Sequence, residues 1–374
     1  MFIIHCYMSN LFSKLNETYD EPAEKHPLRW WHIPLLILLI CGTIYVMRTN
    51  QGRFGSDAVS TTWDKNTLQR SEGAIFGTFY HITYQCNHPL DEGIKATLDK
   101  VDNSLSPFNK NSTITAINNN TSLKADSMFI RVFNLSKQVA SETDGAFDIT
   151  VAPFVNLWGF GFNNIKNVTK ESIDSIRQYV GINNVSLNGD EIIKQHPETM
   201  LDCSAIAKGY GVDAVGEYLE SKGVQQYMVE IGGEVRVRGF NPNGVKWKIG
   251  ITKPNDDSTN LKSDIEEIIM VTDISMATSG NYRNFYIKEG KKYAHTIDPR
   301  TGYPVQHNIL SSTVLAADCA TADAYATSFM VLGLEDAKKV LDKHNELMAF
   351  FIYTKPDGST AEWYSPKLET LIAK

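Results

Sequence analysis

Two segments in the first half of the chain place apolar residues at helical spacing. Over residues 89–105 and 128–143 apolar side chains recur every three or four positions, which predicts two amphipathic helices. The second pattern ends at Thr143-Asp144-Gly145, where glycine can take the left-handed conformation that often closes a helix. The apolar positions are Ile94, Leu98, Val101 and Leu105 in the first helix and Met128, Val132, Leu135 and Val139 in the second.

The rest of the chain mixes short alternating runs with further helical patterns. Gly232-Gly233, Asn241–Gly244 and Glu289-Gly290 are typical hairpin turns, and residues 276–283 have the polar composition of a turn. Further helices are predicted over 171–180, from Ile206 to a stop at Gly223, over 318–332 and over 334–344. The predicted strands are 76–84, 184–193, 226–231, 234–240, 245–252, 268–274, 284–288, 292–297 and 346–353.

This order of elements indicates an α+β fold with mostly antiparallel sheets and packed helices. Hairpin-type connections outnumber the strand-helix-strand units of a doubly wound parallel sheet. The sequence also has no Gly-x-Gly-x-x-Gly after a predicted strand and no Walker-type loop, so two common nucleotide-binding folds are excluded.

The N-terminal region differs from the rest. Residues 1–29 are polar, and Ile33–Met47 is an uncharged apolar run preceded by Trp30, a residue suited to a membrane interface. We interpret residues 30–48 as a membrane anchor or a signal-peptide-like segment, with a buried core helix as the alternative, because the run is short for a span. Residues 49–70 are predicted to be a polar linker, and residues 71–374 the folded domain.

Composition narrows the function classes. The net charge of -7 and the pI near 5.8 argue against a nucleic-acid-binding protein, which would show a basic patch or stripe. The five cysteines form no Cys-x-x-Cys motif and no cluster with metal-ligand spacing.

Three stretches carry candidate chemistry. Asp323 and Thr327 lie four residues apart on one helix face and could offer two oxygens to Mg²⁺, or they could be ordinary polar positions on a tightly packed helix. Asp202 lies just before a helix start rich in small residues, and Lys208 is expected in the second turn of that helix. The two residues could help to bind an anion, or they could be a helix cap and a solvated lysine. The aromatic, glycine-rich run Ala146–Gly161 could line the pocket of a flat ligand or pack in the core.

These stretches, taken in order, resemble the ApbE family of FAD:protein FMN transferases. The resemblance rests on Thr143–Gly161, Leu201–Asp213, Glu230–Glu234, Ala277–Arg283 with His295–Gly302, and Asp318–Gly333. It implies an ApbE-like, T-fold-like architecture. It also implies a Mg²⁺-dependent transferase that moves the FMN half of FAD to a threonine or serine hydroxyl of a target protein, forms a phosphoester bond and releases AMP.

The resemblance assigns roles residue by residue. Asp323, Thr327 and the backbone oxygen of Ala205 match the metal site, and His295 matches the histidine expected to act as the base. Phe76 and Phe108 stand where the family commonly has methionine and tyrosine, so an apolar or aromatic surface is kept and a tyrosine hydroxyl contact is lost. The implied flavin-nucleotide contacts are Phe76, Phe108, Ala146, Phe147, Asp148, Asp202, Lys208 and Ile297.

Two other functions remain open at this point. If water took the place of the acceptor hydroxyl, the protein would be a Mg²⁺-dependent FAD pyrophosphatase that gives FMN and AMP. If it catalysed no reaction, it would be a non-catalytic FAD-binding protein.

The resemblance further implies membrane redox subunits as acceptors. It also implies a place at the bacterial inner membrane, with the catalytic domain facing the periplasm.

Two residues near the end of the predicted hairpin have alternative roles. His295 could be a hydrogen-bonded structural residue, and Asp298 could hold the local turn.

Overall fold

The structure is a computed structural model that describes residues 62–161, 168–252, 265–280, 285–288, 291–306 and 308–372. These ranges belong to a compact unit, Val59–Lys374. The apolar run Ile33–Met47 lies outside them, and among the described helices none has the length and apolar content needed to cross a membrane.

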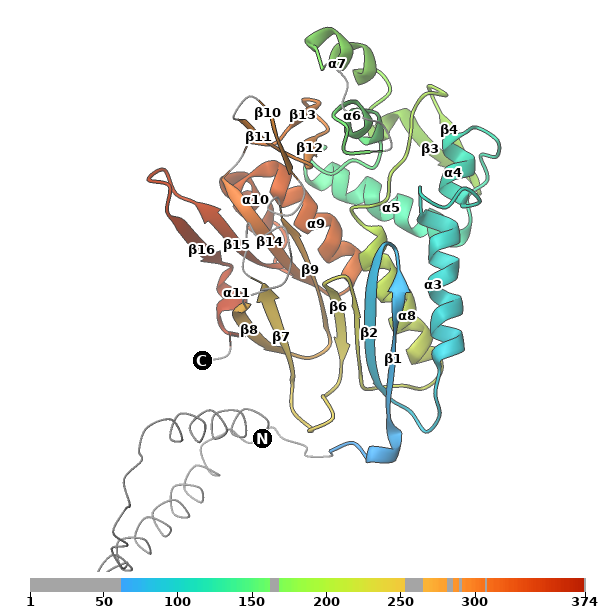
Figure 1. Cartoon of the computed structure of the whole chain (residues 1–374), viewed down its shortest axis with the longest axis vertical. Coiled ribbons are helices and arrows are strands. Elements are labelled where there is room, and N and C mark those ends of the chain that lie inside the picture. The colour runs from blue at the N-terminus through green and yellow to red at the C-terminus, as the bar shows by residue number, and fades with distance from the viewer. Residues whose placement is uncertain are drawn as a thin grey trace, which may run out of the picture. The chain divides into compact units, whose positions relative to one another are not determined.

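One antiparallel sheet organises this unit (Figure 1). Every strand in it pairs antiparallel with its neighbours, as the hairpin-type connections predicted. In spatial order the eight strands are β1 (Leu68–Ile75), β2 (Thr78–Gln85), β5 (Tyr227–Ile231), β6 (Glu234–Arg238), β9 (Ile274–Gly280), β14 (Ile309–Ala316), β15 (Met348–Thr354) and β16 (Thr360–Tyr364).

The larger helices cover one face of this sheet, whereas the short helix Pro366–Glu369 packs on the opposite face. Four two-stranded ribbons are separate from this sheet in the described part of the unit. The helices are α3 (Asp91–Leu105), α4 (Thr113–Asn118), α5 (Ser127–Glu142), α6 (Ala152–Leu157), α7 (Lys170–Arg177), α8 (Ala207–Ser221), α9 (Cys319–Leu332), α10 (Leu334–Leu341) and α11 (Pro366–Glu369). The ribbons are β3 (Val185–Asn188) with β4 (Glu191–Lys194), β7 (Trp247–Thr252) with β8 (Ile265–Val271), β10 (Phe285–Lys288) with β11 (Lys291–Ala294), and β12 (Ile297–Asp298) with β13 (Tyr303–Pro304).

The side chains of the sheet alternate between two cores. Tyr227, Val229 and Ile231 of β5 point toward α3 and α8, whereas Val235 and Val237 of β6 point to the opposite face. On that opposite face they pack against the β7–β8 ribbon, which covers the middle of the sheet. This alternation places Glu234, Arg236 and Arg238 of β6 on the same side as α8, where Glu234 is buried and the two arginines are partly exposed.

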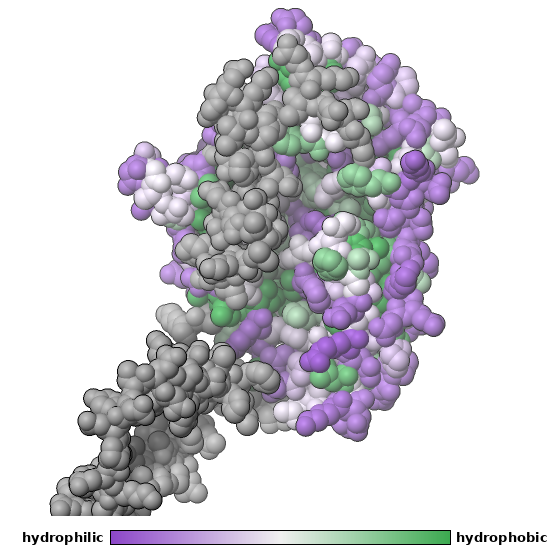
Figure 2. Space-filling model, in the orientation of Figure 1, coloured by the Kyte–Doolittle hydropathy of each residue, from purple (hydrophilic) through white to green (hydrophobic). Residues whose placement is uncertain are grey.

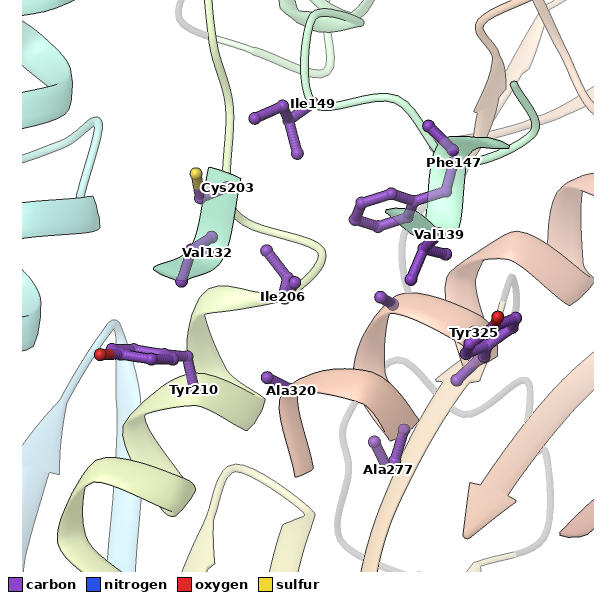
Figure 3. Close-up of a cluster of buried hydrophobic side chains, with 14 of the residues drawn as sticks. Val132, Val139, Phe147, Ile149, Cys203, Ile206, Tyr210, Ala277, Ala320 and Tyr325 are labelled. Atoms are coloured by element: carbon purple, nitrogen blue, oxygen red, sulfur yellow. The ribbon is translucent and has the colours of Figure 1, made fainter. Parts of the chain in front are cut away.

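Helix α9 lies at the centre of the helical layer, beside α8 and against β9 and β14 (Figure 1). It is buried on nearly all sides because its sequence is almost entirely small or apolar, and the Asp318 side chain caps its start by accepting from the Thr321 N–H. In Figure 3, Tyr210 of α8, Ala320 of α9 and Ala277 of β9 lie around one core, together with Phe147 from the loop after α5.

The predicted helices are confirmed, whereas several strand predictions are wrong. The run 76–84 is a strand only from Thr78, because Phe76 and Gly77 have φ of 52° and 73° and turn the β1–β2 hairpin. Residues 184–193 contain the two strands of the β3–β4 ribbon instead of one. The predicted β6–β7 hairpin is also wrong, because β6 pairs with β5 and β9, and β7 pairs with β8.

The boundary between 268–274 and 276–283 was misplaced as well. A tight turn at Thr272-Asp273 separates β8 from β9, and residues expected to form a turn are the strand β9. The folded region starts before the predicted boundary at residue 71, since β1 begins at Leu68 and Trp63 is buried. Strands β14 and β16 were not predicted.

Candidate functional site

A cavity of ≈ 1260 Å³ opens between the helical layer and the loops above it, and all of the predicted site residues line it. Its volume exceeds that of most pockets for drug-sized ligands, so it suits a dinucleotide. Figure 2 shows hydrophobic residues in a recess on this face, with hydrophilic residues along the edge formed by α3 and α4. The predicted residues in its lining are Phe76, Phe108, Ala146, Phe147, Asp148, Asp202, Ala205, Lys208, His295, Ile297, Asp323 and Thr327.

Asp323 and Thr327 lie in this lining on successive turns of α9. Asp323 is 2% exposed, and its Oδ2 accepts a hydrogen bond of 3.0 Å from the N–H of Gly209. The hydroxyls of Thr327 and Ser279 are 3.0 Å apart, so β9 brings another oxygen beside α9. Burial raises the pKa of Asp323.

The contact between Gly209 and Asp323 follows from how α8 begins. The backbone ladder of α8 starts with the bond from Tyr210 to Ile206, so the Gly209 N–H needs an acceptor from outside the helix. The Asp323 carboxylate is that acceptor, and a negative charge is favourable at a helix N-terminus. Ala205 precedes the ladder and lines the same cavity as Asp323.

Lys208 lies in the first turn of α8, not in the predicted second turn, and it is paired rather than solvated. Its Nζ is 2.6 Å from Oε1 of Glu234 and 3.9 Å from Oδ2 of Asp323. Burial lowers the pKa of Lys208, but the charges of Asp323 and Glu234 outweigh it, and the pKa is raised.

Glu234 was missed by the sequence analysis. It is 2% exposed. Burial is the main reason that its pKa is raised to about 7, and the Asp323 charge raises it further although Lys208 acts in the opposite direction. Two features of the sequence could have identified Glu234 as a site residue: its position just after Gly232-Gly233 and the alternation of β6. Charged residues at alternate strand positions usually face solvent, however, and that pattern favoured an exposed side chain.

These groups fit a hard divalent cation. Asp323 and Glu234 place two buried carboxylates beside the single ammonium of Lys208, and a buried charge is costly unless it is paired. The described residues gather no set of three or more His, Cys, Asp or Glu side chains for a metal. A cation here would therefore draw on Asp323, Thr327 and the Ala205 carbonyl, a sparse all-oxygen set of the kind Mg²⁺ completes with water or substrate phosphate.

Three amide groups at the start of α8 already have acceptors within the protein. The N–H groups of Ile206 and Ala207 donate to the carbonyl of Cys203, and Gly209 donates to Asp323. The ammonium of Lys208 adds a positive charge at this end of the helix.

Asp202 and Asp148 shape the loops of the cavity. Oδ1 of Asp202 accepts from the N–H of Ser204, and the cap position of α8 belongs to Ile206, so Asp202 is not a helix cap. Asp148 accepts from the N–H and hydroxyl of Thr150 and, through Oδ2, from the N–H of Ile182. The Asp148 carboxylate thus fixes the turn that presents Ala146 and Phe147.

Apolar side chains form the rest of the wall. Phe147 and Ile297 are buried at 2% and 5% exposure, whereas Phe108 is 76% exposed and lies where a ligand would enter. Phe76 sits in the β1–β2 turn and lies against α8, where a Cβ on Gly211 would come within 2.6 Å of its ring. These residues give the cavity an apolar surface on which a flat ring can pack.

His295 lies between the β10–β11 ribbon and β12, and it shares the cavity with Asp323 and Thr327. Asp298 has another task, because its carboxylate accepts from the backbone N–H and the guanidinium of Arg300 at 2.9 to 3.0 Å. Its carbonyl accepts from the N–H groups of Thr301 and Gly302, so Asp298 holds the local turn as one reading of the sequence suggested.

Comparison with known proteins places this site in a family. The model of the ApbE family matches residues 76–351. A curated protein of Vibrio cholerae named FAD:protein FMN transferase is 37% identical over 313 residues, covering 81% of this chain and 92% of that protein. A protein of Haemophilus influenzae with the same name is 38% identical over 303 residues, covering 76% of this chain and 86% of its own length.

A solved structure agrees with these relatives. The flavin transferase ApbE from Vibrio cholerae superposes with a TM-score of 0.72 at 36% identity, covering 81% of this chain and 99% of that chain. The mixed arrangement of helices and antiparallel sheet predicted from the sequence is the architecture of that structure.

Proposed function

This chain belongs to the ApbE family and is a transferase, and from that premise we propose that it transfers the FMN moiety of FAD to a threonine or serine hydroxyl of a target protein. In the proposed reaction the hydroxyl oxygen bonds to the flavin-side phosphorus of FAD. The bond from that phosphorus to the bridging oxygen breaks, and AMP leaves with the adenylate phosphate. The product is a phosphoester between the target protein and FMN.

The observation that carries this proposal is the cavity of ≈ 1260 Å³, in which an apolar wall, an oxygen-rich carboxylate site and His295 meet. A protein that only stores a flavin needs the wall, but it does not need Asp323 buried beside Lys208 and Glu234. The grouping supports a reaction at a phosphate.

His295 is the proposed general base. A threonine hydroxyl is a weak nucleophile, and a histidine can accept its proton near neutral pH as the new phosphorus–oxygen bond forms. The proton can then pass to the phosphate oxygen of the departing AMP. Asp298 is a poor substitute for this role, because its carboxylate is bonded to Arg300.

The wall and Lys208 bind and orient the substrate. Phe147 and Ile297 present buried apolar surface for the isoalloxazine or adenine ring, and the Lys208 ammonium attracts the pyrophosphate. Asp323, Thr327 and the Ala205 carbonyl would hold Mg²⁺, which when bound neutralises phosphate charge during the displacement.

A transfer assay tests this function. The purified protein is incubated with FAD, Mg²⁺ and a candidate membrane redox subunit, and flavin fluorescence is read after denaturing electrophoresis. We expect a fluorescent acceptor band that disappears with EDTA and with an acceptor whose target threonine is replaced by valine. An acceptor band that persists with the valine variant would contradict transfer to the hydroxyl.

We also propose that the apolar run Ile33–Met47 tethers the enzyme at the bacterial inner membrane, with the catalytic domain in the periplasm. The run, its flanking Trp30 and the polar residues on both sides support this placement. Fractionation of cells that make the full chain tests it, together with protease treatment of spheroplasts. Recovery of the full-length protein in the cytoplasmic fraction would contradict it.

A further inference from the structure

The Lys208 ammonium stands between two buried carboxylates. Its Nζ is 2.6 Å from Oε1 of Glu234 and 3.9 Å from Oδ2 of Asp323. The lysine therefore has two possible partners, and the structure pairs it with Glu234 in a hydrogen-bonded ion pair. Oδ2 of Asp323 instead accepts from the neutral N–H of Gly209 and lies at the longer distance of 3.9 Å from the ammonium.

Glu234 is held firmly in this position. It begins β6 directly after Gly232 and Gly233, whose φ of 61° and 103° turn the chain into the strand. The residue is 2% exposed, and within the described part of the chain its Oε2 is buried without a hydrogen-bond partner. A ligand in the cavity therefore meets Lys208, which is more exposed, before it meets the Glu234 carboxylate.

An ammonium and a divalent cation compete for the same carboxylate. Attraction between charges rises as their distance falls and is strong where water is excluded. If Lys208 moved from 3.9 Å into contact with Asp323, it would neutralise that carboxylate and repel an incoming metal ion. In the structure the ammonium is paired with Glu234 instead.

We propose that Glu234 is a positioning residue that holds the Lys208 ammonium away from Asp323 and so keeps Asp323 open to a divalent cation. This role rests on the proposed function, in which Asp323 binds Mg²⁺. In this role Glu234 acts through Lys208 and does not itself bind the metal.

Cation binding without FAD tests the role, because it does not depend on turnover. Mn²⁺ is titrated into the full-length protein and the free ion is read by electron paramagnetic resonance, with Mg²⁺ competition as a second reading. Glu234→Gln keeps the shape of the side chain and removes its charge. We expect it to weaken Mn²⁺ binding by roughly tenfold or more, because Lys208 then turns to Asp323.

Lys208→Met and the double variant separate this role from a direct metal contact. Lys208→Met should bind Mn²⁺ at least as tightly as the wild type, since the competing ammonium is gone. Adding Lys208→Met to Glu234→Gln should restore the affinity that Glu234→Gln lost. Circular dichroism of each variant confirms that the comparison is made between folded proteins.

The possible outcomes are distinct. Normal Mn²⁺ binding by Glu234→Gln would overturn the positioning role. A double variant that binds Mn²⁺ as weakly as Glu234→Gln would also overturn it, because that result would make Glu234 a metal ligand. Weaker binding by Lys208→Met would overturn it as well, and that single variant remains informative if Glu234→Gln does not fold. Absence of Mn²⁺ and Mg²⁺ binding to the wild type would overturn the proposed magnesium site together with this role.

Discussion

Replacing Gly209 with alanine perturbs the contact between α8 and α9 on which the candidate site is built. A Cβ at position 209 would lie 2.4 Å from the carbonyl oxygen of Cys319, 2.7 Å from its carbonyl carbon and 2.8 Å from Cβ of Asp323. The first two are backbone atoms of α9 that no rotamer change can move. The added methyl group must therefore push the two helices apart.

The expected loss of stability is about 2–3 kcal/mol. Overpacking of this severity costs roughly 2–3 kcal/mol. Displacement of Asp323 weakens its 3.0 Å hydrogen bond from the Gly209 N–H, which removes about 1 kcal/mol more. The higher helix propensity of alanine returns about 1 kcal/mol. Because Asp323 moves with α9, Mg²⁺-dependent FMN transfer should fall as well.

Urea unfolding followed by circular dichroism measures the first effect, and the gel fluorescence assay measures the second. Gly216→Ala is the matched control, since it makes the same change in the same helix. A Cβ there would meet Oη of Tyr227 at 2.9 Å and side-chain atoms of Arg236 at 3.1 Å, so its nearest contacts are side chains rather than the backbone of another helix. Its stability should stay within about 1 kcal/mol of the wild type. A Gly209→Ala variant as stable and as active as Gly216→Ala would refute this description of the helix contact.

Three further substitutions test other parts of the account. Asp323→Ala should abolish Mg²⁺-dependent transfer while circular dichroism stays native, and unchanged activity at limiting Mg²⁺ would place the metal elsewhere. His295→Asn should slow single-turnover FMN transfer by roughly 10²–10⁴-fold with little change in FAD affinity, so a loss of FAD binding by titration would make His295 a ligand contact instead. Asp213→Ala should lower the free energy of unfolding in urea by about 3–5 kcal/mol, because buried Asp213 accepts from the N–H groups of Cys319 and Ala320 and pairs with half-buried Arg236. A change below about 1 kcal/mol would show that these bonds are dispensable.

The helices and the membership of the site could be predicted from the sequence. Amphipathic spacing located α3 and α5, and the all-round small and apolar character of 318–332 located α9. The site residues could be named because they lie in short stretches of sequence that resemble the motifs of the family and follow one another in the same order. The structure then brings the motifs into one cavity, although their individual roles stay predictions.

The strand boundaries could not be predicted because tight turns and buried strands lack the alternating signal. Strand β14 is buried at all but one position, so its sequence ILSSTVLA does not alternate. At Phe76 and Asp273 the backbone takes positive φ, which non-glycine residues rarely adopt, and the sequence gives no sign of a turn at those exact positions.

The buried ion pairs were also invisible to sequence analysis. Glu234 and Arg236 alternate with valines on β6, the pattern of a strand with one face in water. Helix α8 covers that face, so Glu234 meets Lys208 and Arg236 meets Asp213. Only the packing of a distant helix on the strand distinguishes these residues from solvent-exposed charges.

The intact mass of the acceptor protein, measured beside the released nucleotide, tests the central claim most directly. After incubation with this protein, FAD and Mg²⁺, we expect the acceptor to gain the mass of one FMN less one water, and AMP to appear in equal amount. Tandem mass spectrometry should place the gain on a threonine or serine. Release of FMN and AMP with an unmodified acceptor in every membrane redox subunit tried would contradict the claim and make the protein an FAD pyrophosphatase.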